Sequence, residues 1–173
     1  MYGRRVSKSD PRVAACGAVD EFNAAVGVAR VHCANGEISL IISEVQDDLI
    51  LLMGEMATQG DDLERYAADG FERVSDDSVN RLSAHVVRIE KDLNIRFRDW
   101  ATPGKDASPC SAFLDVARTI CRRAEREAVT LSESEQLDNE AVLGYLNRLS
   151  DLLWLLARWE AMSHHQGEVG DTK

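Results

Sequence analysis

Several features that mark other classes of protein are missing from this chain of 173 residues. No apolar run approaches the roughly 20 residues that cross a bilayer, and no signal peptide opens the chain, so we expect a cytoplasmic protein without a membrane partner. Runs that alternate apolar and polar residues are too short to predict β-strands. There is also no internal repeat and no low-complexity segment, so a single domain over residues 1–173 is expected.

Cysteine pairs and basic charge are also lacking. The four cysteines form no CxxC pair and have no histidine at metal-ligand spacing, so we expect reduced thiols and no metal site. His164 and His165 fall in residues 164–173, a polar stretch that we predict to be a disordered tail. The formal net charge of −10 argues against nucleic acid as a partner, because phosphate binding favours a basic face.

The apolar residues that are present recur at helical spacing along most of the chain. We predict an all-α fold, a five-helix up-and-down bundle, since short connections between long amphipathic helices favour antiparallel neighbours. Ser75 and the Ser108-Pro109 pair are the clearest helix starts. The five helices are expected at about 18–33, 37–58, 76–96, 109–131 and 139–163.

Two polar stretches interrupt this pattern. Residues 1–17 carry no helical apolar stripe, so we expect an N-terminal arm that is either floppy or the end of a longer binding loop. Residues 60–77, GDDLERYAADGFERVSDD, are predicted to be an acidic loop.

The segment RTICRRAERE, residues 118–127, concentrates positive charge on an acidic chain. Arg118, Arg122 and Glu125 are spaced i, i+4 and i+7, so they share one edge of the predicted helix beside its apolar stripe. Arg123 and Arg126 lie further around the helix, where they face solvent or a neighbouring subunit. Four arginines face only two glutamates here, which leaves guanidinium groups that an anion or a distant carboxylate could pair.

Each of these residues also has a structural interpretation. Arg122 and Glu125 could form an ordinary surface ion pair on the helix. Asparagine is a poor helix former, so Asn147 in the middle of a predicted helix needs a reason. Its side chain could form a hydrogen bond to a neighbouring helix or contact a ligand. Asp20 could interact with the dipole near the start of the first helix, or it could be the distant partner of Arg118.

Three blocks, GRRVSKSDPRVAACGAVDEFN (3–23), ARTICRRAERE (117–127) and LNRLSDLLWLLAR (146–158), together resemble the PduO-type ATP:cob(I)alamin adenosyltransferases. The resemblance implies a helical bundle assembled as a homotrimer with active sites between subunits. It implies transfer of the 5′-deoxyadenosyl group of ATP to the cobalt of cob(I)alamin, with Mg²⁺ accompanying the nucleotide. A reductase or a cobalamin-dependent enzyme is a possible further partner.

The resemblance also implies roles for single residues. Arg118 matches the arginine that pairs with the aspartate at Asp20 across the subunit cleft, and Trp100 matches the position of an aromatic residue, usually phenylalanine, beneath the corrin. The nucleotide-binding positions are matched by Lys8, Arg122, Arg123, Glu125, Arg126 and Asn147.

The chain departs from the family pattern in places. The Gly-rich loop T-x-T-G-D-x-G-x-T, which wraps the triphosphate with backbone N–H groups, is missing ahead of GRRVSK. Three explanations are open at this point: a start codon assigned too late, a fragment, or a paralogue that has lost ATP turnover. Asp115 stands where the family usually has histidine.

These observations leave three hypotheses. The first is an adenosyltransferase. The second is a catalytically weak homologue that binds nucleotide or corrinoid for delivery or regulation, and the third is a helical interaction module whose arginines are interface charges.

Overall fold

The computed structural model describes residues 1–94, 102–105 and 108–170, with the side chains of 164–170 left aside. This part of the chain contains six α-helices and one short 3₁₀ helix and no β-strand. The helices are α1 (Pro11–Val31), α2 (Gly36–Met56), α3 (Leu63–Ala68), α4 (Asp76–Leu93), α5 (Pro109–Glu133) and α6 (Glu140–Gly170), with η1 at Gly60–Asp62. The all-α prediction is confirmed, and the helix count is one higher than expected.

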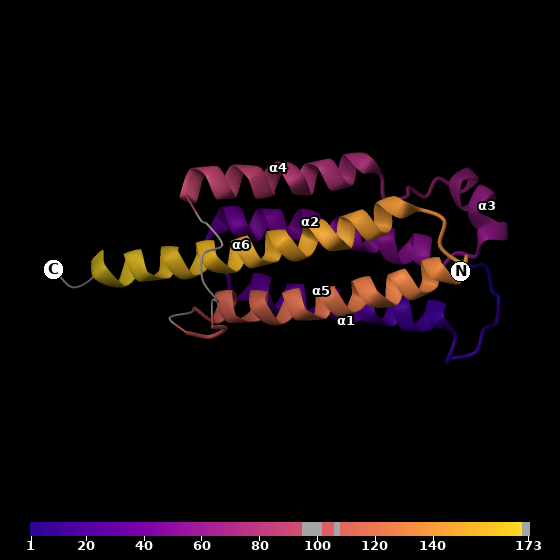
Figure 1. The fold of residues 1–173 in the computed structure, drawn as a ribbon, viewed down its shortest axis with the longest axis horizontal. Helices are drawn as coiled ribbons and strands as arrows, with labels where there is room; N and C mark the ends of the chain where they lie inside the picture. Colours follow the sequence, from indigo (N-terminus) through magenta and orange to yellow (C-terminus); the bar gives the residue numbers. More distant parts are fainter. Residues whose placement is uncertain (95–101, 106–107, 171–173) are drawn as a thin grey trace.

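Five long helices form the bundle, and consecutive long helices run in opposite directions (Figure 1). The most extensive contacts join α1 to α5 and α5 to α6, while α6 also packs against α4 and α1 against α2. Ion pairs such as Arg81–Asp48 and Arg88–Glu37 connect α4 to α2. The up-and-down arrangement follows the prediction from helix spacing.

The helix starts are set by local capping. The Ser108 side chain accepts a hydrogen bond from the Ser111 N–H at 3.1 Å, with Pro109 in the first turn of α5, as the sequence predicts. Asn35 caps α2 through the N–H groups of Glu37 and Ile38. Asn139 caps α6 by accepting from the Ala141 N–H at 3.1 Å.

Three predicted boundaries differ from the structure. α1 begins at Pro11 rather than near Ala18, because Asp10 caps it by accepting the Arg12 N–H, so 11–17 are helix and not part of an arm. Within the predicted acidic loop, η1 and α3 form a short helical turn. α6 continues to Gly170, beyond the end expected at Ser163.

The first ten residues lie on the end of the bundle where α2 finishes. The Met1 amino group donates to the Ala57 carbonyl at 2.7 Å, and Arg4 donates to Asp62 at 2.5 Å. Tyr2 donates its hydroxyl hydrogen to Asp69 at 2.9 Å. The segment is therefore attached by polar contacts rather than floppy.

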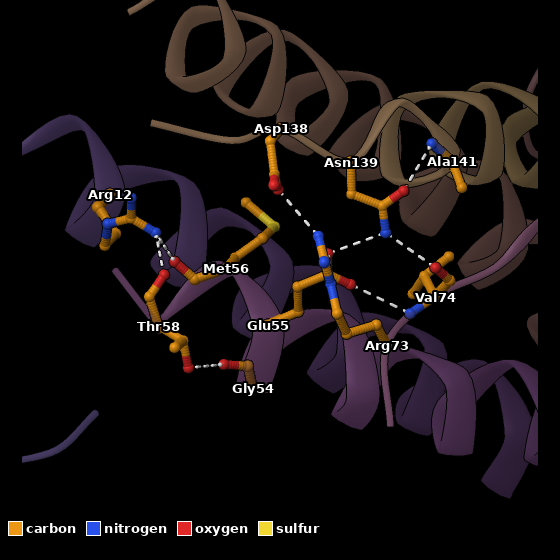
Figure 2. Close-up of polar contacts among 10 residues, drawn as sticks. All are labelled: Arg12, Gly54, Glu55, Met56, Thr58, Arg73, Val74, Asp138, Asn139 and Ala141. Carbon is orange, nitrogen blue, oxygen red and sulfur yellow. Dashed lines mark hydrogen bonds and ion pairs between the residues drawn. The ribbon is translucent and has the colours of Figure 1, made fainter. Parts of the chain in front are cut away.

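Arg12 joins two of the connections at this end of the bundle through buried hydrogen bonds. Its side chain is buried and donates to the carbonyls of Met56 at 2.5 Å, Thr58 at 2.7 Å and Gln136 at 2.6 Å. Figure 2 shows the two contacts at the end of α2. Carbonyls at a helix end have no partner within the helix, so one guanidinium satisfies acceptors from two connections.

Glu55 organises the adjacent connections in the same view (Figure 2). This buried carboxylate accepts from the Arg73 side chain at 2.8 Å, the Val74 N–H at 3.1 Å and the Asn139 amide at 2.8 Å. Asn139 also donates to the Val74 carbonyl at 2.8 Å. The network ties the segment before α4 to the start of α6, which fixes where both helices enter the bundle.

The core is continuous and mostly aliphatic. On α5 the stripe of Ala117, Cys121, Ala124, Ala128 and Leu131 is fully buried, and Phe113 and Ile120 are partly buried beside it. On α6 the predicted Leu146, Leu149, Leu153 and Leu156 are all buried. In the described part of the chain, no helix has the length and apolar character needed to cross a bilayer.

Candidate functional site

A groove of about 690 Å³ lies over α6, with α4 on one side and α5 on the other. We call it the α4–α6 groove. Its lining includes three arginines, two carboxylates and an indole from three helices: Arg118, Arg122, Arg148, Glu90, Asp151 and Trp154. Its volume is in the range of small-molecule sites, and its arginines favour an anion.

Arg118 and Arg122 both line the groove, one helical turn apart on α5. They are partly exposed, with 28% of the Arg118 side chain and 47% of the Arg122 side chain accessible. The apolar stripe of α5 faces the core, so the side of the helix next to this stripe lies along α6. The guanidinium groups of Arg118 and Arg122 are on that side. Two planar guanidinium groups at this separation are suited to grip neighbouring phosphate groups.

Arg122 is oriented by Glu125, which also bonds to α6. The Arg122 Nη1 lies 2.5 Å from Glu125 Oε2, and the Asn147 amide donates to Glu125 Oε1 at 3.0 Å. The surface ion pair and the interhelical hydrogen bond, the structural interpretations of these residues, are thus both present. They also place Arg122, Glu125 and Asn147 together at the edge of the groove.

Arg118 is oriented by Asp115, whose carboxylate is buried. Arg118 Nε donates to Asp115 Oδ1 at 3.5 Å, and Arg158 of α6 donates to Asp115 Oδ2. The guanidinium of Arg158 lies 5.8 Å from the centre of the Trp154 ring. Asp115, a carboxylate outside the segment 118–127, therefore serves Arg118 and a second arginine.

Arg123 and Arg126 point away from the groove, as the helical spacing predicts. Arg123 pairs with Glu21 of α1 on the other flank of α5, so Glu21 supplies a further carboxylate that the local count omitted. Arg126 donates to the Arg122 carbonyl at 2.9 Å and is exposed.

The remaining predicted site residues are not brought to the groove. Asp20 is exposed on α1 and has no hydrogen bond or ion pair in the described residues, and the same holds for Lys8 before α1. Because α1 begins at Pro11, Asp20 is nearly three turns inside the helix, beyond the reach of the terminal dipole. That interpretation of Asp20 is wrong. Trp100 lies outside the described residues.

Sequence reasoning missed several residues that line the groove or orient its arginines. Asp115 precedes Arg118 by one helical turn, which was a signal for their pairing. Arg148, Asp151 and Trp154 belong to the LNRLSDLLWLLAR block, but only their exposure in the fold shows that they face α4. Glu90 of α4 had no signal, because nothing local indicated which side of α4 packs against α6.

The chain matches the model of the family described as cobalamin adenosyltransferase over residues 1–160. It belongs to this family. It is 32% identical over 158 residues to the corrinoid adenosyltransferase of Bacillus subtilis, a match that covers 91% of this chain and 78% of that protein. It is 31% identical over 170 residues to the corrinoid adenosyltransferase PduO of Salmonella typhimurium, covering 96% of this chain and 47% of that protein.

The chain thus spans about half the length of the Salmonella protein and of a Citrobacter freundii PduO, of which the match covers 48%. Among solved structures it resembles a variant of the PduO-type ATP:corrinoid adenosyltransferase of Lactobacillus reuteri complexed with cobalamin and ATP. That match has a TM-score of 0.82 and 32% identity, and it covers 95% of this chain and 88% of the other. The absence of the Gly-rich loop stays a prediction.

Proposed function

We propose that this chain transfers the 5′-deoxyadenosyl group of ATP to the cobalt of a reduced corrinoid. The observation that carries the proposal is the pair Arg118 and Arg122, open to one groove and each oriented by its own carboxylate, in a chain of this family. The Lactobacillus reuteri neighbour, whose structure was determined with cobalamin and ATP, supports the choice of substrates.

In the proposed reaction, the cobalt lone pair of cob(I)alamin forms a bond to the ribose C5′ of ATP. The C5′–O bond breaks and its electron pair leaves with triphosphate. The negative charge of the leaving group develops where Arg118 and Arg122 would hold the phosphates, so fixed guanidinium groups stabilise it. Alignment of C5′ with cobalt supplies the remaining acceleration.

Glu125 and Asp115 act as positioning residues in this proposal. Each holds one guanidinium in a fixed direction, so less side-chain freedom is lost when a polyphosphate binds. Asn147, whose amide donates to Glu125 at the same edge, is a proposed contact of the nucleoside. Lys8, Arg123 and Arg126 are proposed nucleotide contacts on the resemblance alone, and Trp100 is proposed to lie beneath the corrin.

The Mg²⁺ proposed to accompany ATP takes oxygen ligands, usually one or two carboxylates together with phosphate oxygens. Glu90 and Asp151 are the carboxylates among the residues lining the groove, so the side chains present fit this ion. When bound, the ion neutralises phosphate charge. The phosphates themselves are positioned by Arg118 and Arg122 in this proposal.

We also propose that the active form is a homotrimer with sites between subunits. Among the described residues of its own chain Asp20 has no hydrogen bond or ion pair, and Arg118 lies on the α6 side of α5, so a pairing of these two residues would join two copies. A reductase that supplies cob(I)alamin is the partner that the reaction requires. We place the protein in the cytoplasm, where ATP is available.

The test is an anaerobic assay of the purified chain with ATP, Mg²⁺ and chemically reduced cobalamin. We expect the absorbance spectrum to convert to that of adenosylcobalamin with release of triphosphate. Binding of ATP or corrinoid without this conversion would overturn the transfer reaction and favour a binding protein.

A further inference from the structure

Two thiols and a carboxylate come together away from the α4–α6 groove. The Sγ atoms of Cys33 and Cys110 and a carboxylate oxygen of Glu160 all lie within 4.8 Å of one another. Cys33 follows α1, Cys110 is in the first turn of α5, and Glu160 is on α6. Their proximity is a product of tertiary folding, which explains why cysteine spacing in the sequence gave no sign of it.

The carboxylate of Glu160 is held in a fixed orientation. Its Oε1 accepts the Ala34 N–H at 3.3 Å, and its Oε2 lies 3.7 Å from the Cys33 sulfur. The Cys33 thiol also contacts the Asn35 carbonyl at 3.2 Å. One oxygen is therefore used to fix the α1–α2 connection, while the other is turned toward the thiols.

The cluster lacks positive charge. Glu160 is 3% exposed and Cys110 is fully buried, and in the described part of the chain no Lys, Arg or His forms an ion pair with Glu160. A metal ion at this position would supply that charge.

We propose that Cys33, Cys110 and Glu160 form a binding site for one thiophilic divalent cation of the Zn²⁺ type. Tetrahedral coordination with sulfur at about 2.3 Å and oxygen at about 2.0 Å places ligand atoms roughly 3.5–4 Å apart. The 3.7 Å between Cys33 Sγ and Glu160 Oε2 already matches this separation. Two thiolate ligands disfavour Mg²⁺ and Ca²⁺, which prefer oxygen.

On binding, two sulfur–metal bonds and one oxygen–metal bond form, and each thiol releases its proton to solvent. The fourth position is left for water, and Cys33, which is only partly buried, provides access for the ion. The metal would join the α1–α2 connection to α5 and α6. Because an unfolded chain lacks the assembled site, binding should raise the melting temperature.

Co²⁺ is a suitable probe because thiolate ligation gives it a charge-transfer absorption. The full chain, reduced and freed of metal by a chelator, is titrated with Co²⁺ and then with Zn²⁺. We expect one equivalent of Co²⁺ to produce the thiolate absorption, Zn²⁺ to displace it, and Zn²⁺ to raise the melting temperature. Absence of this absorption in the wild-type chain would overturn the proposal, as would a Cys33–Cys110 disulfide that forms in place of metal binding.

Single substitutions of the three proposed ligands, compared with the other two cysteines, test which side chains bind the metal. Cys33→Ser, Cys110→Ser and Glu160→Gln should each weaken Co²⁺ binding at least about tenfold, whereas Cys16→Ser and Cys121→Ser should leave it unchanged. Cys33 is partly exposed, so its variant remains informative even if Cys110→Ser does not fold. Unchanged thiolate absorption in the folded Cys33→Ser protein would remove the site.

Discussion

Asn147 on α6 donates a hydrogen bond to Glu125 on α5, with 3.0 Å between Nδ2 and Oε1. The other oxygen of the same carboxylate lies 2.5 Å from Arg122 Nη1. Glu125 thus joins a residue of the RTICRRAERE block to one of the LNRLSDLLWLLAR block. Together with the hydrogen bond from the Cys121 thiol to the Leu146 carbonyl, it links two blocks that are separate motifs in the sequence.

Glu125→Gln should separate binding from chemistry. The amide keeps an acceptor and the shape of the side chain but loses the charge that holds Arg122, so we expect the KM for ATP to rise about tenfold with a smaller change in kcat. Steady-state kinetics would show this. Glu133→Gln, at the exposed end of α5, is the control and should behave as wild type, and equal KM values for the two variants would contradict a positioning role.

Arg122→Ala should reduce adenosyl transfer by about a hundredfold or more, because the guanidinium is proposed to stabilise the leaving triphosphate. The bundle should remain folded by circular dichroism, since the side chain is 47% exposed. Arg30→Ala on α1, which removes an exposed arginine bonded to Ser43, is the matched control. Turnover at the wild-type rate in Arg122→Ala would exclude the proposed role.

Asp20→Asn tests the proposed contact between subunits. We expect weaker ATP binding, because Arg118 of another copy would lose a carboxylate that orients it, and the effects of Asp20→Asn and Arg118→Gln should not add in a double-mutant cycle. Isothermal titration with ATP measures the affinity, and light scattering measures the oligomeric state. Asp47→Asn, an exposed aspartate on α2, is the control, and additive effects of the two site variants would contradict the pairing.

Arg12→Ala should destabilise the fold by about 2–4 kcal/mol. The change leaves three carbonyls, those of Met56, Thr58 and Gln136, without their charged donor in a buried setting. Urea unfolding at neutral pH measures the loss. Arg5→Ala, an exposed arginine of the N-terminal segment, should change stability little, and a similar small effect of Arg12→Ala would show that water replaces the lost contacts.

The attachment of the N-terminal segment should depend on pH. The hydrogen bond from Arg4 lowers the pKa of Asp62, so the contact contributes stability above the ordinary aspartate pKa of about 4 and loses it as the pH falls through the lowered pKa. The protection of the amides of residues 1–10, meaning their exchange rate relative to that of an unstructured chain at the same pH, should fall in that acid range. In Arg4→Ala the exchange of this segment should already be fast at neutral pH, and a segment that stays protected in this variant would contradict the prediction.

Much of the fold followed from local patterns in the sequence. The apolar stripes of α5 and α6 and the Ser108-Pro109 start are decided by residues close together in the chain, and the structure confirms them. The start of α1 was misplaced because the Asp10-Pro11 capping pair was not used as a signal, and because the first turns bury small side chains such as Ala15 that make a weak apolar stripe. α3 was missed because it has only six residues and buries a single side chain, that of Tyr66.

The site was less accessible from sequence. The shared edge of Arg118, Arg122 and Glu125 is a property of one helix and could be predicted. The second partner of Asp115, the link between Arg123 and Glu21, and the contribution of Glu90 depend on which helices are neighbours. Which helices are neighbours is decided by packing over the whole bundle, and the apolar periodicity of a single helix does not reveal it.

The order in which the helices pack also bears on synthesis of the chain. α1 makes its most extensive contacts with α5, although about half of the sequence separates them (Figure 1). As the chain emerges from the ribosome, the apolar face of α1 formed by Val19, Phe22 and Val26 can rest on α2, but its larger partner arrives only with α5. The part of α1 that packs on α5 therefore stays without its final partner until α5 has been synthesised.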